Sequence, residues 1–319
     1  MSDFRPIFVV GVGRSGTTLL QHLISANSAV AGMPESSFFR RYVVTHALDR
    51  VYREEGIAAV LDLLRTDERF GRLQLDEMLD AAQYGAGGFS AARFYMQILE
   101  AFASRNRQPF VCDKDPRLVE FLADIHQLFG SAVVVHIIRD PRAVLASKKK
   151  ALWSRDGSLS RHLFAYKSQL AIGRTLGPRL FGENYMEVSY EELTSDTETV
   201  LRGLCEKIGI QFEPAMLNHT ASAPALVAES ELAWKTDVLQ PVDAGKNRKW
   251  KTELTVSEIY LTESVCPIDE QRSRLEGVGA FTKTMLYLQA RAISLASSAY
   301  CHHIVSRQPR VGRLPEGGW

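Results

Sequence analysis

The chain has 319 residues, of which 45% are hydrophobic and 24% are charged, a composition typical of a globular protein that can bury a full core. Its 38 Lys and Arg side chains nearly balance its 37 Asp and Glu side chains, which excludes a strong overall field directed at nucleic acid or a membrane surface. The four cysteines are scattered and show neither CxxC nor zinc-ligand spacing, so reduced thiols are expected.

The two ends of the sequence suggest a cytoplasmic protein. An apolar run begins at residue 7, and we therefore expect neither a signal peptide nor an N-terminal anchor. The last apolar-leaning segment, 281–305, contains Lys283, Arg291 and two histidines, which argues against a membrane span.

The first predicted elements are a strand over Ile7–Val10, a glycine-rich turn and a helix over Ser15–Ser25. Residues 27–39 read as a turn and a short exposed segment, because Pro34 prevents a smooth helix there. A helical pattern of mixed charge fills 40–107, with Ser90 as the N-cap of a helix that runs to about residue 104. We interpret 40–108 as a helical insertion.

Regular alternation of strands and helices resumes after this insertion. Apolar, β-branched runs at 109–113, 132–138 and 185–188 are typical of strands buried on both faces of a parallel sheet. Helices are predicted at about 118–128, 143–150, 160–176 and 191–208. The pattern predicts an α/β fold, a P-loop-type doubly wound parallel sheet flanked by helices, within one domain spanning 1–319.

A last helix is predicted at 280–305, followed by a loose tail over 306–319. Apolar residues in this helix follow one another in steps of four and three: Phe281, Met285, Leu288, Ala292, Leu295 and Ala299. Such a seam could pack on the domain or on a second subunit of a homodimer. Packing on the domain is the favoured expectation, since the seam holds barely three heptads and two of its positions are alanines.

The turn after the first strand has the spacing of a nucleotide phosphate loop. Glycines such as Gly11 and Gly16 allow positive φ and a close approach of backbone N–H groups, and the next helix points its positive dipole end at the same place. Thr17 stands where an ATP-binding loop would carry lysine, and the cation is instead Arg14 within the loop. The sequence predicts an anion site that differs from a triphosphate site. The alternatives are a glycine turn that merely joins two elements, and a P-loop small-molecule kinase that requires ATP and Mg²⁺.

Further charged residues lie at predicted strand ends. Arg139 ends one strand, a proline then begins a helix, and Ser147 lies about two turns into that helix. Lys114 ends another strand between two aspartates, where it either neutralises charge at a leaving oxygen or simply pairs with those aspartates. Glu35 follows Arg14 by 21 residues and is a candidate general base, with a solvated loop glutamate as the alternative.

Together these motifs resemble those of sulfotransferases that use 3′-phosphoadenosine 5′-phosphosulfate (PAPS), in particular the branch with tyrosylprotein sulfotransferases and bacterial relatives. The resemblance is close over about 6–39 and 109–150, and loose over about 185–255. It implies that the 5′-phosphosulfate is bound by the loop residues Gly13, Arg14, Ser15, Gly16, Thr17 and Thr18. It also implies that Arg139 and Ser147 bind the 3′-phosphate.

The same resemblance implies roles for residues outside the two phosphate motifs. Glu35 would be the catalytic base, while Lys114 and Arg14 would act on the transferred group. Tyr190 would contact the adenosine, and Lys249 would meet the 3′-phosphate side. Two neighbouring cations, Lys246 and Arg248, cannot be ranked against Lys249 from the sequence.

The resemblance implies transfer of a sulfuryl group from PAPS to an acceptor hydroxyl, with release of 3′,5′-bisphosphoadenosine and no required metal. The acceptor is expected to be a carbohydrate, a lipid or a small metabolite, and the helical insertion is expected to shape its pocket. In tyrosylprotein sulfotransferases, arginines just beyond the glutamate bind acidic peptides; Arg40 and Arg41 could do so here, but Ser37 replaces one family arginine. Protein-tyrosine sulfation is therefore an alternative, as is a catalytically silent nucleotide-binding protein.

Overall fold

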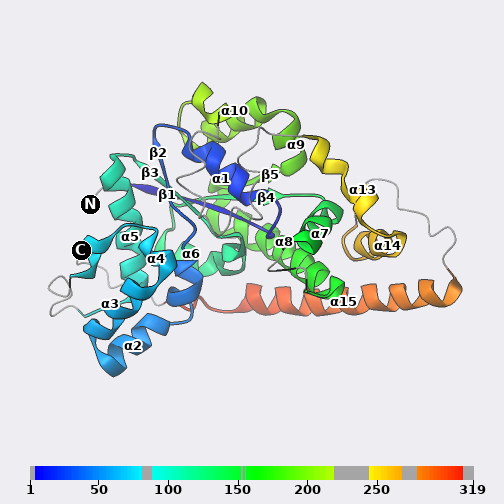
Figure 1. Cartoon of the computed structure of the whole chain (residues 1–319), viewed down its shortest axis with the longest axis horizontal. Coiled ribbons are helices and arrows are strands. Elements are labelled where there is room, and N and C mark those ends of the chain that lie inside the picture. The colour runs from blue at the N-terminus through cyan, green and yellow to red at the C-terminus, as the bar shows by residue number, and fades with distance from the viewer. Residues whose placement is uncertain are drawn as a thin grey trace.

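A computed structural model describes residues 4–80, 88–151, 154, 156–218, 244–267 and 279–311. At its centre five parallel strands form one sheet in the order β2-β3-β1-β4-β5 (Figure 1). Their bounds are β1 (Arg5–Gly11), β2 (Val30–Gly32), β3 (Phe110–Lys114), β4 (Val133–Ile138) and β5 (Tyr185–Ser189). The predicted doubly wound α/β fold is confirmed.

Both faces of the sheet are covered, because side chains alternate along each strand. Ile7 and Val9 of β1 point to one face, where they pack with α1 (Thr17–Ser25) and α10 (Thr197–Ile208). Phe8 and Val10 point to the other face and join a core with α5 (Ala91–Asn106), α6 (Leu122–Leu128) and α8 (Leu159–Phe181). Figure 1 shows α1 and α10 on the opposite side of the sheet from α8.

Strand β2 is absent from the prediction, which treated 27–39 as a turn and an exposed segment. Its three residues pair in parallel with β3, with Val30 beside Phe110 and Gly32 beside Cys112. The Met33 amide extends the pairing by donating to the Cys112 carbonyl at 3.0 Å. A strand this short carries too few residues for an apolar period to be recognised, and tertiary pairing determines it.

Several helix boundaries differ from expectation. Helix α1 begins at Thr17 rather than Ser15, because Gly16 adopts a left-handed conformation and serves as N-cap. The predicted helix 191–208 is divided into α9 (Tyr190–Ser195) and α10 at Asp196, whose carboxylate caps the second helix by accepting from the Thr199 amide. Part of the predicted helix 118–128 is a 3-10 helix, Pro116–Phe121, that precedes α6.

Between β2 and β3 the chain is largely helical within the described residues. After a π-helical turn at Phe39–Val43 come α2 (Ala47–Glu55), α3 (Ile57–Thr66), α4 (Glu68–Gly71), a 3-10 turn at Asp76–Leu79, and α5. An aromatic cluster joins this block to the sheet, since Phe38 stacks on Tyr95 with ring centroids 6.0 Å apart and also contacts Phe94. The residues just after Glu35 are therefore fixed by core packing.

The C-terminal third contributes two helices that pack on α7 (Pro141–Lys150), the helix that carries Ser147. It contains 3-10 turns at Pro214–Leu217 and Ala244–Arg248, then α13 (Trp250–Glu253), α14 (Val256–Val265) and α15 (Ala280–Ser306). Lys149 pairs with Glu258 at 2.7 Å, and Lys150 pairs with Glu253, which ties α7 to α14 and α13. Helix α15 lies along α8 and α14 (Figure 1).

The segment after α15 is held against α6, since Asp124 accepts from the Val311 amide at 3.2 Å and from the Arg307 guanidinium at 3.2 Å. The rest of the predicted tail, 312–319, lies outside the described residues. In the ranges that are described, no helix combines the length and the apolar character needed to cross a bilayer.

Candidate active site

The loop between β1 and α1 has the backbone of an anion-binding turn. Gly11, Arg14 and Gly16 all have φ in the left-handed range, at 153°, 77° and 95°. Gly11 lies so close to β4 that an added Cβ would stand 2.6 Å from the Ile137 carbonyl oxygen. Among the described residues no side chain caps α1, so its first N–H groups face the loop and favour a bound anion.

Tyr190, predicted to lie near the adenosine, packs directly on this loop. A Cβ on Gly16 would stand 2.3 Å from the Tyr190 ring, so only glycine fits beneath it. The Arg139 guanidinium lies over the same ring, 4.0 Å from its centroid. This stack joins the starts of α1 and α9 to the end of β4, where parallel strands carry ligand sites.

The two predicted phosphate motifs contact one another. Arg14 Nε donates to the Ser147 hydroxyl at 2.9 Å, and Arg139 Nη1 donates to the Arg14 carbonyl at 3.2 Å. Tyr166 of α8 supports Arg139 from behind by donating its hydroxyl to the Arg139 carbonyl at 2.6 Å. The loop, β4 and α7 thus form one hydrogen-bonded unit.

This unit fits a phosphate-bearing ligand. In the part of the chain that the structure describes, Arg139 Nε and the Ser15 hydroxyl are buried and have no hydrogen-bond partner. A buried guanidinium N–H without a partner is costly, and a bound phosphate would satisfy it. The cationic side chains, loop amides and helix N-terminus together form a donor set suited to an anionic nucleotide.

Sheet register brings the two predicted catalytic side chains together. Glu35 follows β2 and Lys114 ends β3, the neighbouring strand, so both reach the same edge of the sheet. They form an ion pair between Lys114 Nζ and Glu35 Oε2, in which the Lys114 side chain is 2% exposed and that of Glu35 21%. On the other side of β3, Val9 of β1 pairs with Lys114, which places the lysine beside the start of the anion-binding loop.

The aspartates that flank Lys114 have other partners. Asp113 accepts a hydrogen bond from the buried Tyr95 hydroxyl of α5, and Asp115 pairs with Arg40 at 3.1 Å. Burial raises the pKa of Asp113 to about 7, against the opposing effect of the hydrogen bond from Tyr95. The Lys114 ammonium therefore extends towards Glu35, and Asp113 and Asp115 anchor the strand end to the helical segment.

The two arginines beyond Glu35 are both paired within the chain. Arg40 contacts Asp115 and also donates to the Ser37 hydroxyl at 3.3 Å. Arg41 pairs with Asp67 at 2.6 Å. The positive charges near the predicted acceptor side are thus compensated by carboxylates of the chain.

The remaining predicted residue, Lys249, is exposed in the turn before α13. Arg248 is also exposed, and the side chain of Lys246 lies outside the described part of the structure. The neighbouring Asn247 points inward and donates to the Thr194 hydroxyl of α9 at 2.9 Å. The contact of Lys249 with the 3′-phosphate side stays a prediction, and Asn247 joins the residues beside α9.

Several supporting residues were not predicted from the sequence. Tyr95, Tyr166 and Asn247 gave no local signal, because each acts through a tertiary contact. Arg142 lies between Arg139 and Ser147 and was given no role from the sequence. Its guanidinium lies 3.9 Å from the Trp250 ring centroid and pairs with Asp140 and Glu263. It therefore holds α13 against α7.

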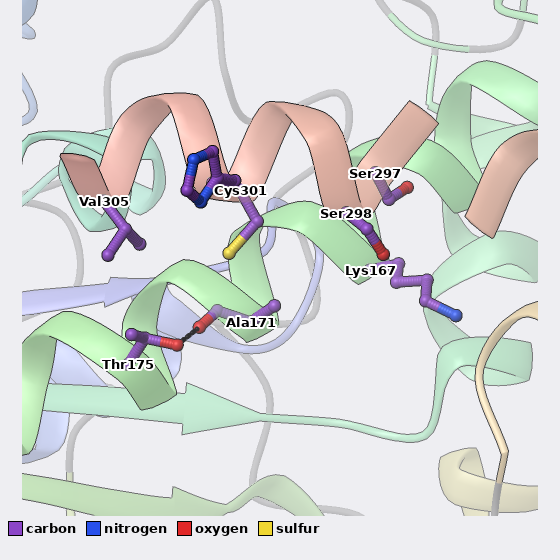
Figure 2. A pocket seen from close by; sticks show the side chains of 8 residues that line it. Lys167, Ala171, Thr175, Ser297, Ser298, Cys301 and Val305 are labelled. Atoms are coloured by element: carbon purple, nitrogen blue, oxygen red, sulfur yellow. Dashed lines mark hydrogen bonds between the residues drawn. The ribbon is translucent and has the colours of Figure 1, made fainter. Parts of the chain in front are cut away.

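Two further features bear on ligand binding. Within the described ranges, no group of three or more His, Cys, Asp or Glu side chains is arranged to hold a metal ion. A groove of about 330 Å³ lies between α8 and α15, lined by residues that include Lys167, Thr175, Ser297 and Cys301 (Figure 2). None of the predicted site residues lines this groove, so it is separate from the candidate active site.

The fold is a parallel α/β sheet with a loop suited to bind an anion, and comparison with known proteins gives the family. The Sulfotransferase family profile matches residues 6–214, more than half of the chain. The protein therefore belongs to the sulfotransferase family. The match spans the anion-binding loop, Glu35, Lys114, Arg139, Ser147 and Tyr190.

Individual relatives are distant. An uncharacterised protein of Aquifex aeolicus is 26% identical over 85% of this chain and 33% of its own, and protein-tyrosine sulfotransferase 2 of Gallus gallus is 25% identical over 76% and 62%. The chain thus spans one third to about two thirds of the length of these relatives. The solved sulfotransferase domain of the Synechococcus PCC 7002 olefin synthase has a similar fold, with a TM-score of 0.59 at 18% identity, covering 97% of this chain and 98% of that one.

Proposed function

We propose that the protein transfers a sulfuryl group from PAPS to an acceptor hydroxyl and releases 3′,5′-bisphosphoadenosine. The observation that carries this proposal is the joined pair of phosphate motifs, in which Arg14 contacts Ser147 and Arg139 presents a buried, unpartnered Nε. A donor that carries phosphate at both the 3′ and the 5′ position of its ribose would engage the two motifs at once. A donor without the 3′-phosphate would leave Arg139 Nε without a hydrogen-bond acceptor.

In this proposal each group of residues has a distinct task. The loop amides and Arg14 would bind the 5′-phosphosulfate, Arg139 and Ser147 would bind the 3′-phosphate, and Tyr190 would border the nucleotide. The acceptor oxygen would form a bond to sulfur while the bond from sulfur to the bridging phosphate oxygen breaks. Most of the rate enhancement would come from positioning and from compensation of charge.

The Glu35–Lys114 pair would supply the proton and charge chemistry. Glu35 would accept the proton of the acceptor hydroxyl as its oxygen attacks sulfur. Lys114 would stabilise the electron pair that remains on the bridging phosphate oxygen. The contact between the two side chains supports these two roles, since Glu35 and Lys114 would both have to lie beside the same reacting sulfur.

We further propose that the acceptor is a neutral molecule, a carbohydrate, a lipid or a small metabolite, rather than an acidic tyrosine peptide. An acidic peptide needs uncompensated cations beside the base. Here Arg40 is paired with Asp115, Arg41 is paired with Asp67, and serine stands at position 37. Adding a peptide carboxylate to these arginines would require displacing carboxylates that already bind them.

The test is transfer of radiolabel from PAPS to two acceptor sets, one of neutral sugars, sterols and hydroxylated lipids, the other of acidic tyrosine peptides. We expect label in at least one neutral acceptor and none above background in the peptides. Preferential labelling of the peptides would overturn the acceptor assignment and leave the donor assignment intact. Label transfer that depends on ATP and Mg²⁺ in place of PAPS would identify the kinase alternative.

A further inference from the structure

Within the described ranges, helix α15 docks on the rest of the chain through one face. Its buried residues are Ala290, Ile293, Ser297 and Ile304, and they face α8, α14 and the core. Lys167 of α8 strengthens this contact by donating to the Ser294 hydroxyl at 3.0 Å. The orientation of the helix about its own axis is therefore fixed.

The apolar seam recognised in the sequence lies on the opposite face. All six seam residues are exposed, namely Phe281, Met285, Leu288, Ala292, Leu295 and Ala299. Phe281 is 78% exposed and Leu295 66%. At about 100° per residue, the seam centre is roughly 150° from the buried face. The expectation that the seam packs on the domain is therefore wrong.

We propose that this seam binds a second copy of the same chain, with the two α15 helices antiparallel. A two-fold axis that passes next to position 290 would place Phe281 against the second copy's Ala299, Met285 against its Leu295, and Leu288 against its Ala292. Each pair is then repeated by symmetry. The seam is thus complementary to itself, as a two-fold interface requires.

Residue size supports the antiparallel arrangement. Phe281 and Leu288 would each meet an alanine, so large and small side chains alternate and the helices can approach closely. In a parallel pair, Phe281 would meet Phe281 and Ala292 would meet Ala292. That arrangement would crowd one layer and leave a void in another.

The exposed area is sufficient for a stable contact. The four large side chains of the seam, Phe281, Met285, Leu288 and Leu295, leave on the order of 500 Å² of apolar surface exposed on each copy. Two copies would bury on the order of 1,000 Å², about the lower limit for a specific interface. The face is also suited to association because α15 has only two formal charges, Lys283 and Arg291, and no Asp or Glu.

The main electrostatic cost of this dimer is repulsion between the two copies of Arg291. Arg291 would lie near its symmetry mate beside the axis. Its long aliphatic stem can pack along the seam while the guanidinium reaches solvent, which limits the repulsion. A bilayer surface is the other occupant that an apolar face with cations could have, and it is an outcome of the test.

The test is sedimentation of the full chain at about 1 to 100 µM, the range in which modest interfaces dissociate. We expect a concentration-dependent dimer, and at least about a 100-fold weaker association for Leu288→Lys, which places a charge in the centre of the seam. Tyr287→Lys is the matched control, because Tyr287 is exposed on the same helix but lies about 100° from the seam. We expect it to dimerise like the parent chain.

Cysteine cross-linking tests the direction of the helices. In a Cys301→Ser background, a mixture of Leu288→Cys and Ala292→Cys chains should form a disulfide between the two variants, while each variant alone should not. A protein that is monomeric at all concentrations would overturn the proposal, as would a monomer that sediments with anionic vesicles. Efficient cross-linking of each variant with itself would overturn the antiparallel register. The proposal does not depend on the transferase activity.

Discussion

Arg14 Nε donates a hydrogen bond to the Ser147 hydroxyl at 2.9 Å. The contact joins a loop at the start of the sheet to a helix that follows a different strand. Arg139 completes the connection by donating to the Arg14 carbonyl and by stacking on Tyr190, which itself rests on Gly16. Donor binding at one phosphate motif is therefore expected to depend on the other.

Ser147→Ala removes the hydroxyl from this contact and from the proposed 3′-phosphate site. We expect five- to tenfold weaker binding of 3′,5′-bisphosphoadenosine, about the net value of one hydrogen bond. Affinity for adenosine 5′-phosphate, which lacks the 3′-phosphate, should change less. Calorimetric titration measures both, with Ser195→Ala at the exposed end of α9 as the control. An equal loss for both ligands would contradict the assignment.

Glu35→Gln preserves the size of the side chain but removes the proposed base. We expect kcat to fall by about 10² to 10⁴, the usual contribution of general acid–base catalysis, while the bisphosphate still binds. Steady-state turnover with any accepted substrate and a binding titration separate the two effects. Glu213→Gln, which alters a glutamate that contacts Ser28 far from the pair, should keep full turnover. A Glu35→Gln enzyme with unchanged kcat would exclude this residue as the base.

Lys114→Met keeps the aliphatic length of the side chain and removes its charge. We expect kcat to fall by about 10² to 10³, in line with the loss of one charge-stabilising group. Bisphosphate affinity should change much less than kcat, because the lysine is proposed to act on charge that develops during transfer. Lys207→Met, an exposed substitution at the end of α10, provides the control. A loss confined to KM would assign Lys114 to substrate binding instead.

Asp67→Asn removes the charge that compensates Arg41 but retains an oxygen that can cap α4. We expect the freed arginine to increase binding of acidic tyrosine peptides severalfold, without a change in bisphosphate affinity. Fluorescence anisotropy with a labelled acidic peptide measures the effect, and Asp62→Asn at an exposed position of α3 is the control. Identical peptide binding by the parent and the Asp67→Asn variant would show that Arg41 does not control acceptor charge.

Asp113→Asn tests the buried carboxyl behind Lys114. Burial raises the pKa of Asp113 from 3.8 to about 7, so the folded chain retains a proton that the unfolded chain loses between these values. The contribution to the free energy of unfolding therefore falls as pH rises from about 4 to 7. The asparagine variant does not titrate there.

We consequently expect Asp113→Asn to gain stability relative to the parent by the order of 1 kcal/mol between pH 5 and pH 8. Urea denaturation at the two pH values measures the difference, and Asp62→Asn should show none because Asp62 is largely exposed. A parallel shift of both proteins would mean that Asp113 is ionised across the whole range.

The main fold was predictable because four of the five strands lie in largely apolar stretches and the loop residues lie beside one of them. The relation between Glu35 and Lys114 was harder to predict, since it depends on β2, three residues whose pairing partner is distant in the sequence. The sequence suggested both residues separately and only the register shows why they meet. Local pattern cannot supply such a pairing.

Other parts of the candidate site depend on contacts that sequence spacing does not encode. Tyr190 was placed near the nucleotide, but its packing on Gly16 follows from the sharp start of α9 after β5. The Arg40–Asp115 and Arg41–Asp67 pairs join residues from separate elements, so their charge compensation was not foreseen. The seam of α15 was recognised as a pattern, while its outward orientation is set by the opposite face.

We propose that the joined phosphate motifs bind a bisphosphorylated adenosine, and thermal unfolding in the presence of different nucleotides tests this proposal. A ligand that binds only the folded chain raises Tm by mass action. We predict a clear rise with 3′,5′-bisphosphoadenosine, a smaller one with ADP, and loss of the bisphosphate effect in Arg139→Ala. A rise with ATP and Mg²⁺ alone, or a bisphosphate effect that survives Arg139→Ala, would contradict the account.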